Sequence, residues 1–178
     1  MSNDNGSKKK SIAVKDLDPD FKHEVSRHHG GECIQRCFAC GTCTAGCPVR
    51  ALKDTYNPRR IIHQVLLGMR DEVLNNDFIW LCSTCYTCQE RCPQGVRVAD
   101  IMTVLKNMAV EEGRTPSAYV QQADLIVKHG RLYEIDEFDN RKREKAGLPP
   151  IPTKCDDIAK IFEATGLSKK LGGKGEAK

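Results

Sequence analysis

Two short runs of cysteines are the part of this sequence best suited to chemistry. The first reads Cys37-Phe-Ala-Cys40-Gly-Thr-Cys43-Thr-Ala-Gly-Cys47-Pro48 and the second reads Cys82-Ser-Thr-Cys85-Tyr-Thr-Cys88-Gln-Glu-Arg-Cys92-Pro93. Both have the spacing C-x2-C-x2-C-x3-C-P, so one ligand pattern occurs twice. Three thiolates at intervals of three residues let one tight turn of chain hold three irons of a cubane, and the fourth iron needs a cysteine from elsewhere. The runs therefore predict two [4Fe-4S] clusters.

The fourth cysteine of each run is expected to serve the cluster of the other run, as in two-cluster ferredoxins with this spacing. The sequence then predicts two mixed ligand sets, which are Cys37, Cys40, Cys43 and Cys92 for one cluster and Cys82, Cys85, Cys88 and Cys47 for the other. Ligands exchanged in this way fasten the two halves of the protein together. They also bring the clusters close enough for direct electron exchange.

Zinc is the competing metal, because pairs of Cys-x2-Cys units also build four-cysteine zinc sites. The third cysteine, the fourth cysteine after three residues and the proline that follows favour iron-sulfur clusters over zinc. Cys33 and Cys155 lie outside the runs. We expect both to remain unligated, as inert thiols in the protein interior.

Residues between and beside the ligands also suit a cluster. Gly41 and Gly46 allow main-chain amides to approach the sulfurs, where hydrogen bonds raise the reduction potential. Pro48 and Pro93 turn the chain away from the cluster. Five apolar side chains are candidates for a shell that excludes water, with ordinary core packing as their alternative role: Phe38, Phe78, Ile79, Trp80 and Tyr86.

Motifs for a substrate or a nucleotide cofactor are missing from the sequence. No Gly-x-Gly-x-x-Gly fingerprint follows a strand, so we expect neither flavin nor nicotinamide in this chain. No adjacent Cys-Cys pair occurs either, so the cysteine-rich motif that builds an atypical, substrate-cleaving cluster is absent. Two clusters without catalytic residues predict an electron carrier.

Composition and charge limit the class of protein further. The chain is 39% hydrophobic, 6% aromatic and 29% charged, which is typical of a helical globular protein in water. The net charge of +4 comes partly from lysines near both ends, so we expect no nucleic-acid partner. Neither an apolar signal core nor an unbroken apolar stretch of membrane-spanning length occurs. We therefore expect a cytoplasmic protein that is not inserted in a membrane and whose thiols stay reduced.

Helix signals along the chain predict a mostly α-helical fold, built around the two clusters. Five apolar stripes have helical spacing, and caps, prolines in first turns or terminal glycines mark the ends of four of them. These stripes run from Asp18 to Gly30, Asn57 to Met69, Val98 to Ala109, Thr115 to Gly130 and Thr153 to Gly166. Thr153 and Asp156 have the spacing of a capping box for the last of them.

Three regions follow from these signals. Residues 1–10 are charged and are predicted to be a disordered lead-in. Residues 11–130 are predicted to form the helical two-cluster domain, and residues 131–178 a charged excursion followed by a C-terminal helix and tail. The part from 131 to 152 is polar and ends in Leu-Pro-Pro-Ile-Pro, which indicates either an ordinary surface loop or a segment extended along a partner.

The sequence resembles the C subunit of the soluble CoB-CoM heterodisulfide reductase of methanogenic archaea. The likeness rests on CFACGTCTAGCPV from Cys37 to Val49, on Asn57-Pro58-Arg59 before a helix, and on IWLCSTCYTCQERCPQGV from Ile79 to Val96. The segment between the two runs, with a helix inside it, is similar to the α-helical ferredoxin module. That module also occurs in iron-sulfur subunits of succinate and glycerol-3-phosphate dehydrogenases.

The resemblance implies a relay that carries electrons in a larger heterodisulfide reductase complex. In that complex the flavin-containing A subunit would bifurcate electrons, the cysteine-rich B subunit would cleave the CoM-S-S-CoB disulfide, and a hydrogenase or other module would supply the electrons. This chain would itself have no catalytic residue. The alternatives are the iron-sulfur subunit of a quinone-linked dehydrogenase and an iron-sulfur or zinc regulatory module.

Overall fold

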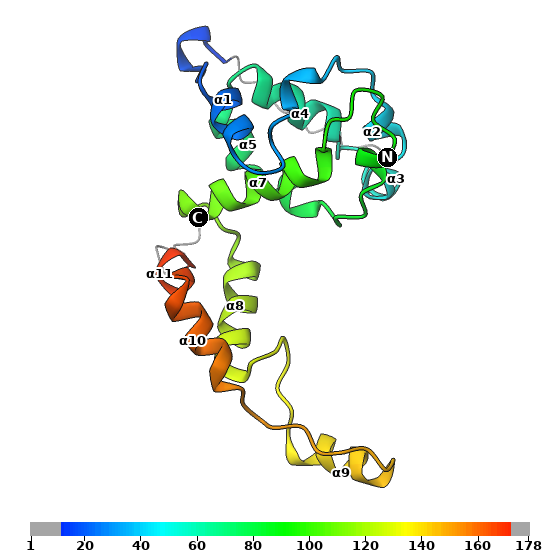
Figure 1. Cartoon of the computed structure of the whole chain (residues 1–178), viewed down its shortest axis with the longest axis vertical. Coiled ribbons are helices and arrows are strands. Elements are labelled where there is room, and N and C mark those ends of the chain that lie inside the picture. The colour runs from blue at the N-terminus through cyan, green and yellow to red at the C-terminus, as the bar shows by residue number, and fades with distance from the viewer. Residues whose placement is uncertain (1–11, 172–178) are drawn as a thin grey trace, which may run out of the picture. The chain divides into compact units, whose positions relative to one another are not determined.

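The computed structural model describes residues 12–171, and within that range the protein is helical and has no β-strand (Figure 1). The prediction of a mostly α-helical fold is therefore confirmed. The lead-in expected at residues 1–10 lies outside the described residues.

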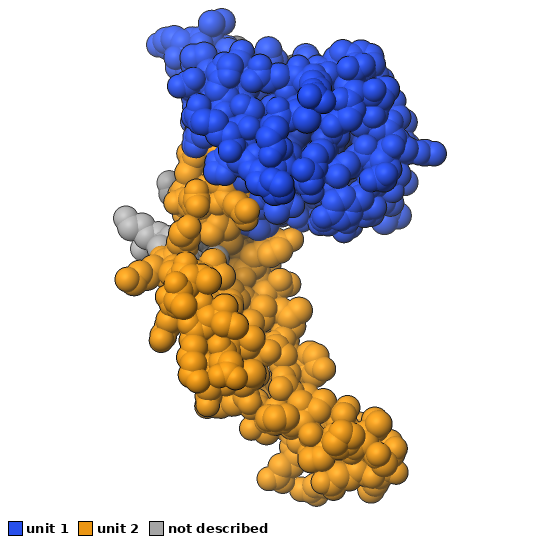
Figure 2. All heavy atoms as spheres, in the orientation of Figure 1, with its two compact units in different colours: residues 1–106 blue, residues 107–178 orange. Residues whose placement is uncertain are grey.

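Internal contacts divide the chain into two compact units, Met1–Lys106 and Asn107–Lys178, which Figure 2 shows in blue and orange. The division falls inside one helix, α7 (Val98–Glu111). Because compactness is not independent folding, the predicted domain boundary at residue 130 stays a prediction.

The first unit consists of short helices joined by tight turns. They are the 3-10 helices η1 (Val14–Asp16), η2 (Ile34–Arg36) and η3 (Asp77–Leu81), and the α-helices α1 (Phe21–Arg27), α2 (Thr42–Ala45), α3 (Pro48–Leu52), α4 (Pro58–Leu66), α5 (Arg70–Leu74) and α6 (Thr87–Glu90), followed by α7. Helix α4 packs against α1, α2 and α5, and α2 packs against α6. The helix at the centre of this unit therefore touches the first cysteine run directly.

Helix α4 forms where the sequence predicts it, because its ends carry strong local signals. The Asn57 side chain caps it by accepting a hydrogen bond from the Arg60 amide, and Pro58 occupies the first turn. Ile61, Ile62 and Val65 form its buried face. The helix ends at Leu66, short of the predicted Met69, because the chain reverses through Gly68 at φ +75°. The Met69 amide then donates to the Gln64 carbonyl, as in a Schellman cap.

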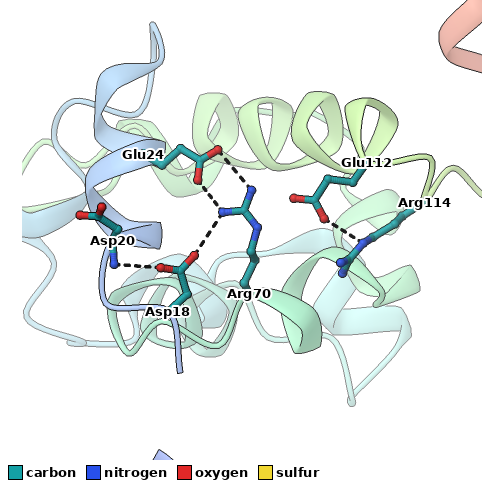
Figure 3. Close-up of polar contacts among 6 residues, drawn as sticks. All are labelled: Asp18, Asp20, Glu24, Arg70, Glu112 and Arg114. Carbon is teal, nitrogen blue, oxygen red and sulfur yellow. Dashed lines mark hydrogen bonds and ion pairs between the residues drawn. The ribbon is translucent and has the colours of Figure 1, made fainter. Parts of the chain in front are cut away.

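Helix α1 is held to the start of α5 by the guanidinium of Arg70. Figure 3 shows this group between Asp18 and Glu24, with Nη1 3.3 Å from Asp18 Oδ2 and Nη2 3.2 Å from Glu24 Oε1. The same guanidinium lies over the Phe21 ring, 5.2 Å from its centroid. The hydrogen bond from Arg70 is the main reason that the pKa of Glu24 is lowered. The pair therefore links the N-terminal helix to the body of the first unit.

The second unit holds α8 (Ser117–His129), α9 (Glu137–Lys145), α10 (Asp156–Ala164) and α11 (Leu167–Leu171). Helix α8 begins and ends as predicted, after Pro116 and before Gly130, which has φ +75°. Helices α8 and α10 pack together. A methylene on Gly130 would lie 2.4 Å from Cys155 Cβ, so only glycine permits this approach. A turn before α8 carries the ion pair of Arg114 Nε with Glu112 Oε2 at 2.9 Å, also drawn in Figure 3.

The charged excursion at 131–152 contains one more helix than expected, α9. The Asp136 side chain caps it by accepting from the Asp139 amide at 2.9 Å. The Asn140 side chain then exchanges two hydrogen bonds with the main chain of Ile151, at 3.0 and 2.8 Å. The segment is therefore helical over Glu137–Lys145, and the irregular chain that follows returns to the helix at Ile151. Contact of this segment with a partner stays a prediction.

The start of the last predicted helix differs from the capping-box prediction. Helix α10 begins at Asp156 with Cys155 as its N-cap residue, and no side chain makes the capping hydrogen bond. Thr153 therefore does not cap the helix. The predicted end is confirmed, because Gly166 follows the helix at φ +67°.

Candidate iron-sulfur centre

The two cysteine runs follow the same backbone course, so the repeat in sequence is also a repeat in structure. The residue before the second cysteine of each run has a positive φ, +60° at Ala39 and +53° at Thr84. The residue after it is also left-handed, +89° at Gly41 and +61° at Tyr86, and each is the N-cap of a four-residue helix, α2 or α6. A non-glycine residue in this conformation is strained, which is common where a loop must place ligands.

A threonine contacts the second cysteine of each run at the same relative position. Cys40 Sγ lies 3.3 Å from Thr42 Oγ1, and Cys85 Sγ lies 3.6 Å from Thr87 Oγ1. Hydrogen bonding from these threonines is the main reason that the pKa values of both thiols are lowered. The arrangement favours the thiolate, which is the form that binds metal.

The third cysteine of each run is in a drier environment. Burial raises the pKa of Cys43, and it raises the pKa of Cys88 to about 12. Thiolates at these two positions therefore need a cation close by, such as the iron of a cluster.

Two pockets each gather four cysteines, three from one run and the last from the other. The first pocket brings together Cys37, Cys40, Cys43 and Cys92. The second pocket brings together Cys82, Cys85, Cys88 and Cys47. These are the two groups of four that the cysteine spacing predicts. That each group ligates one cluster stays a prediction.

Single-ion coordination does not fit the thiols of either pocket. A tetrahedral zinc site holds four sulfurs about 2.3 Å from one ion. Within residues 12–171, no three His, Cys, Asp or Glu side chains converge in a way that could hold one metal ion. Cysteines arranged around the wall of a pocket suit a multi-iron cubane, whose irons each take their own thiolate.

Several residues that line the pockets carry no signal in the sequence. The second pocket is walled by Tyr56, which is 1% exposed, and by Met102 and Val98 from α7. The first pocket is walled by Ile62, Val96 and the side chain of Arg59. Arg59 and Val96 stood in quoted motifs, and Ile62, Val98 and Met102 stood in predicted helical stripes, whose spacing does not indicate a cluster pocket.

The predicted apolar shell is only partly present. Phe38 lines the first pocket and Tyr86 lines the second, but they are 60% and 43% exposed, so both lie at the pocket mouths. Phe78, Ile79 and Trp80 line neither pocket. The fully buried Ile79 belongs to the core of the first unit.

Cys33 and Cys155 line neither pocket and are only partly buried. We expect Cys33→Ser and Cys155→Ser chains to bind as much iron as the unmodified protein, because neither thiol lines a cysteine pocket. Iron and acid-labile sulfide analysis measures this directly. A loss of iron in either variant would show that a ligand outside the two runs takes part.

Fold and pockets together define a helical iron-sulfur protein. The family model described as a 4Fe-4S dicluster domain matches residues 32–96, which include both cysteine runs. The protein therefore carries two [4Fe-4S] clusters. Within the described range, none of the helices is of a length and apolarity that could cross a membrane.

Curated relatives specify the family. The chain is 41% identical to the C subunit of the ferredoxin:CoB-CoM heterodisulfide reductase of Methanosarcina mazei, over 78% of this chain and 83% of the relative. It is 35% identical to the iron-sulfur C subunit of the CoB-CoM heterodisulfide reductase of Methanopyrus kandleri, over 90% and 91%. It is 32% identical to the C subunit of the H2:CoB-CoM heterodisulfide,ferredoxin reductase of Methanothermobacter thermautotrophicus, over 88% and 87%. The chain belongs to the family of heterodisulfide reductase C subunits.

Proposed function

We propose that this chain is the electron relay of a heterodisulfide reductase complex. It carries electrons from the flavin-containing A subunit, where bifurcation takes place, to the cysteine-rich B subunit, which cleaves CoM-S-S-CoB. The observation that carries the proposal is the pairing of four cysteines with each pocket. A cubane with a protein thiolate on every iron has no open position for a substrate sulfur. The chain therefore transfers electrons and leaves the disulfide chemistry to its partner.

The proposed ligands are Cys37, Cys40, Cys43 and Cys92 in the first pocket and Cys82, Cys85, Cys88 and Cys47 in the second. When bound, each cluster accepts and donates one electron at a time. The chain holds the sulfurs on rigid turns: the Val96 amide donates to Cys92 Sγ at 3.3 Å, and Thr42 and Thr87 contact their neighbouring cysteines. Buried side chains such as Tyr56 and Ile62 exclude water from the inner walls.

Exposed cysteines give each pocket a place to exchange electrons with another protein of the complex. Cys40 and Cys85 are both exposed, whereas their run-mates are partly buried. Partners that dock over these two loops would meet the edge of one cluster each. We assign these partners to the flavin-containing and the cysteine-rich subunits, with a hydrogenase or another electron-input module further upstream, and we place the complex in the cytoplasm.

The proposal predicts that the isolated chain, once reduced, will not transfer electrons to the heterodisulfide. Cleavage of a disulfide by one-electron carriers needs a site that holds the half-reduced state, which belongs to a dedicated cofactor. The test reduces the purified chain chemically, adds CoM-S-S-CoB, and follows the loss of the reduced-cluster EPR signal.

The same measurement is then repeated with the purified cysteine-rich subunit present. We expect reoxidation to be slow with the chain alone and to accelerate by orders of magnitude with the partner. Rapid reoxidation by the chain alone would contradict the relay and would reveal a substrate site on this chain. Absence of acceleration with the cysteine-rich subunit would contradict the assigned partner.

A further inference from the structure

The two pockets differ in charge. The first pocket is lined by one cationic side chain, Arg59, in addition to its cysteines. The second pocket is lined by apolar and hydroxyl side chains, among them Val49, Tyr56 and Met102, and by no cation. A pair of clusters in such pockets experiences different electrostatic environments although the loops that hold them are alike.

Local hydrogen bonds hold the backbone of Arg59 beside the first pocket. Its amide donates to Thr44 Oγ1 at 3.1 Å, and the Thr44 hydroxyl donates to the Asn57 side chain at 2.9 Å, which also caps α4. The guanidinium lies over Gly41, where Nη1 would be 3.5 Å from a Cβ atom. Gly41 therefore leaves the space that the guanidinium uses.

Arg59 is exposed, and among residues 12–171 no carboxylate forms an ion pair with it. Asp54 and Arg50 line an open surface pocket together with Arg59, so charges of both signs lie on that side of it. Two other cations contact the surroundings of the second pocket without lining it. The Lys106 ammonium donates to the Cys82 carbonyl at 3.2 Å, and Arg50 lines an open surface pocket together with Cys47. The Arg91 side chain, from the second cysteine run, lies over Gly46 of the first run and lines neither pocket.

Hydrogen bonds to sulfur also raise the potential of a cluster, and both pockets have them. In the first pocket Cys40 contacts the Thr42 hydroxyl, Cys43 contacts the Thr44 hydroxyl, and the Val96 amide donates to Cys92. In the second pocket Cys85 contacts the hydroxyls of Thr87 and Ser83, and Cys82 bonds to the hydroxyl of Tyr56. The lining cation is the feature that distinguishes the first pocket.

We propose that Arg59 raises the reduction potential of the cluster in the first pocket. This potential then lies above that of the cluster in the second pocket, so the cluster in the first pocket is reduced first. Reduction adds one electron and no proton to a site that is already anionic, and a cation on the pocket wall stabilises the added charge. The apolar wall of the second pocket stabilises it less. This inference rests on the proposed relay function, because the difference in potential favours electron transfer from the cluster in the second pocket to the cluster in the first.

The test is an EPR-monitored redox titration of the full, cluster-loaded chain. We expect Arg59→Gln to lower the reduction equilibrium constant of one cluster about tenfold, which is about 59 mV for a one-electron couple, with a smaller change at the other. Arg59→Lys keeps the charge and should retain most of the potential. Iron content, measured on every variant, shows that both clusters are present.

Signals are assigned to the pockets with Cys40→Ser and Cys85→Ser, because each of these cysteines belongs to its own run whichever way the fourth ligands are distributed. Arg60→Gln is the matched control: it removes the same charge from the next residue, which is exposed like Arg59 but lines neither cysteine pocket. A shift in the cluster of the Cys40 loop by Arg59→Gln alone supports the proposal.

Three results would overturn it: unchanged midpoints in Arg59→Gln, an equal shift in Arg60→Gln, or a larger shift in the cluster of the Cys85 loop. None of these results depends on the heterodisulfide or on a partner protein. Failure of the relay assay would therefore leave the potential difference measurable, and an absent difference would leave the relay assay unaffected.

Discussion

Replacing Cys47 with serine is expected to remove or degrade the cluster held by Cys82, Cys85 and Cys88, although these cysteines are distant in sequence. The cluster held by Cys37, Cys40 and Cys43, which belong to the same run as Cys47, should remain. Cys47 lies in the pocket of the second run and not in the pocket of the first. A serine oxygen is a poorer ligand for iron than a thiolate, so the fourth iron becomes labile. We expect a loss of up to about half of the iron, together with selective loss of one EPR signal.

The reciprocal variant is the control for this result. Cys92→Ser should affect the cluster at Cys37, Cys40 and Cys43, because Cys92 lines the first pocket. The two variants should therefore remove different EPR signals. If Cys47→Ser instead removes the signal that Cys40→Ser removes, the ligands are not exchanged and each run holds its own cluster.

The cysteine groups could be predicted from the sequence because ligand spacing is a local property. A C-x2-C-x2-C-x3-C-P run indicates which three sulfurs can face one cubane, and the repeat offers the last cysteine of the other run as the fourth. The pockets bring these cysteines together, and their ligation of the clusters stays a prediction. The walls could not be predicted in the same way. Tyr56 and Met102 meet at the second pocket only through packing between distant segments, and their spacing is that of ordinary core residues.

Helices were predictable where local signals agree with packing. Helix α4 has an Asn cap, a first-turn proline, an apolar face and a terminal glycine, and helix α8 has a proline before it and a glycine after it. Helix α9 has almost no apolar residues, so the stripe that marks the others is absent. Asp136 followed by Asp139 and a basic C-terminal turn were the signals available for it.

The smallest helices were not predictable because nothing in their own sequence requires them. Helices α2 and α6 have four residues each, too few for a periodic pattern. They follow from the cysteine loops, whose left-handed residues at Gly41 and Tyr86 direct the chain into a single turn. The Thr153 prediction failed for a related reason, since a capping box is a weak signal when Cys155 lies closer to the helix start.

Close approach between two chain segments makes Gly68 one of the most sensitive positions in the first unit. The Asp18 amide donates to the Gly68 carbonyl at 2.8 Å, and a Cβ atom on Gly68 would lie 2.2 Å from the Asp18 carbonyl oxygen. The Asp18 carbonyl oxygen is a main-chain atom, and the position of a Cβ atom is fixed by the main chain. Neither atom can therefore move away by rotation of a side chain. Asp18 also contacts Arg70, so a displaced Asp18 would weaken the link between α1 and α5.

Gly68→Ala is therefore expected to destabilise the cluster-loaded protein by more than about 3 kcal/mol, because the left-handed conformation and the overlap both disfavour a side chain. In a chain of this length such a loss lowers the midpoint of thermal unfolding by roughly 6–12 °C, measured by circular dichroism. Gly95→Ala is the matched control in the same unit: Gly95 has φ +64° and no atom within 4 Å of its Cβ position. It should cost only the conformational part, about 1–2 kcal/mol. Equal shifts in the two variants would show that the segments at Asp18 and Gly68 separate easily, and that their contact does not stabilise the unit.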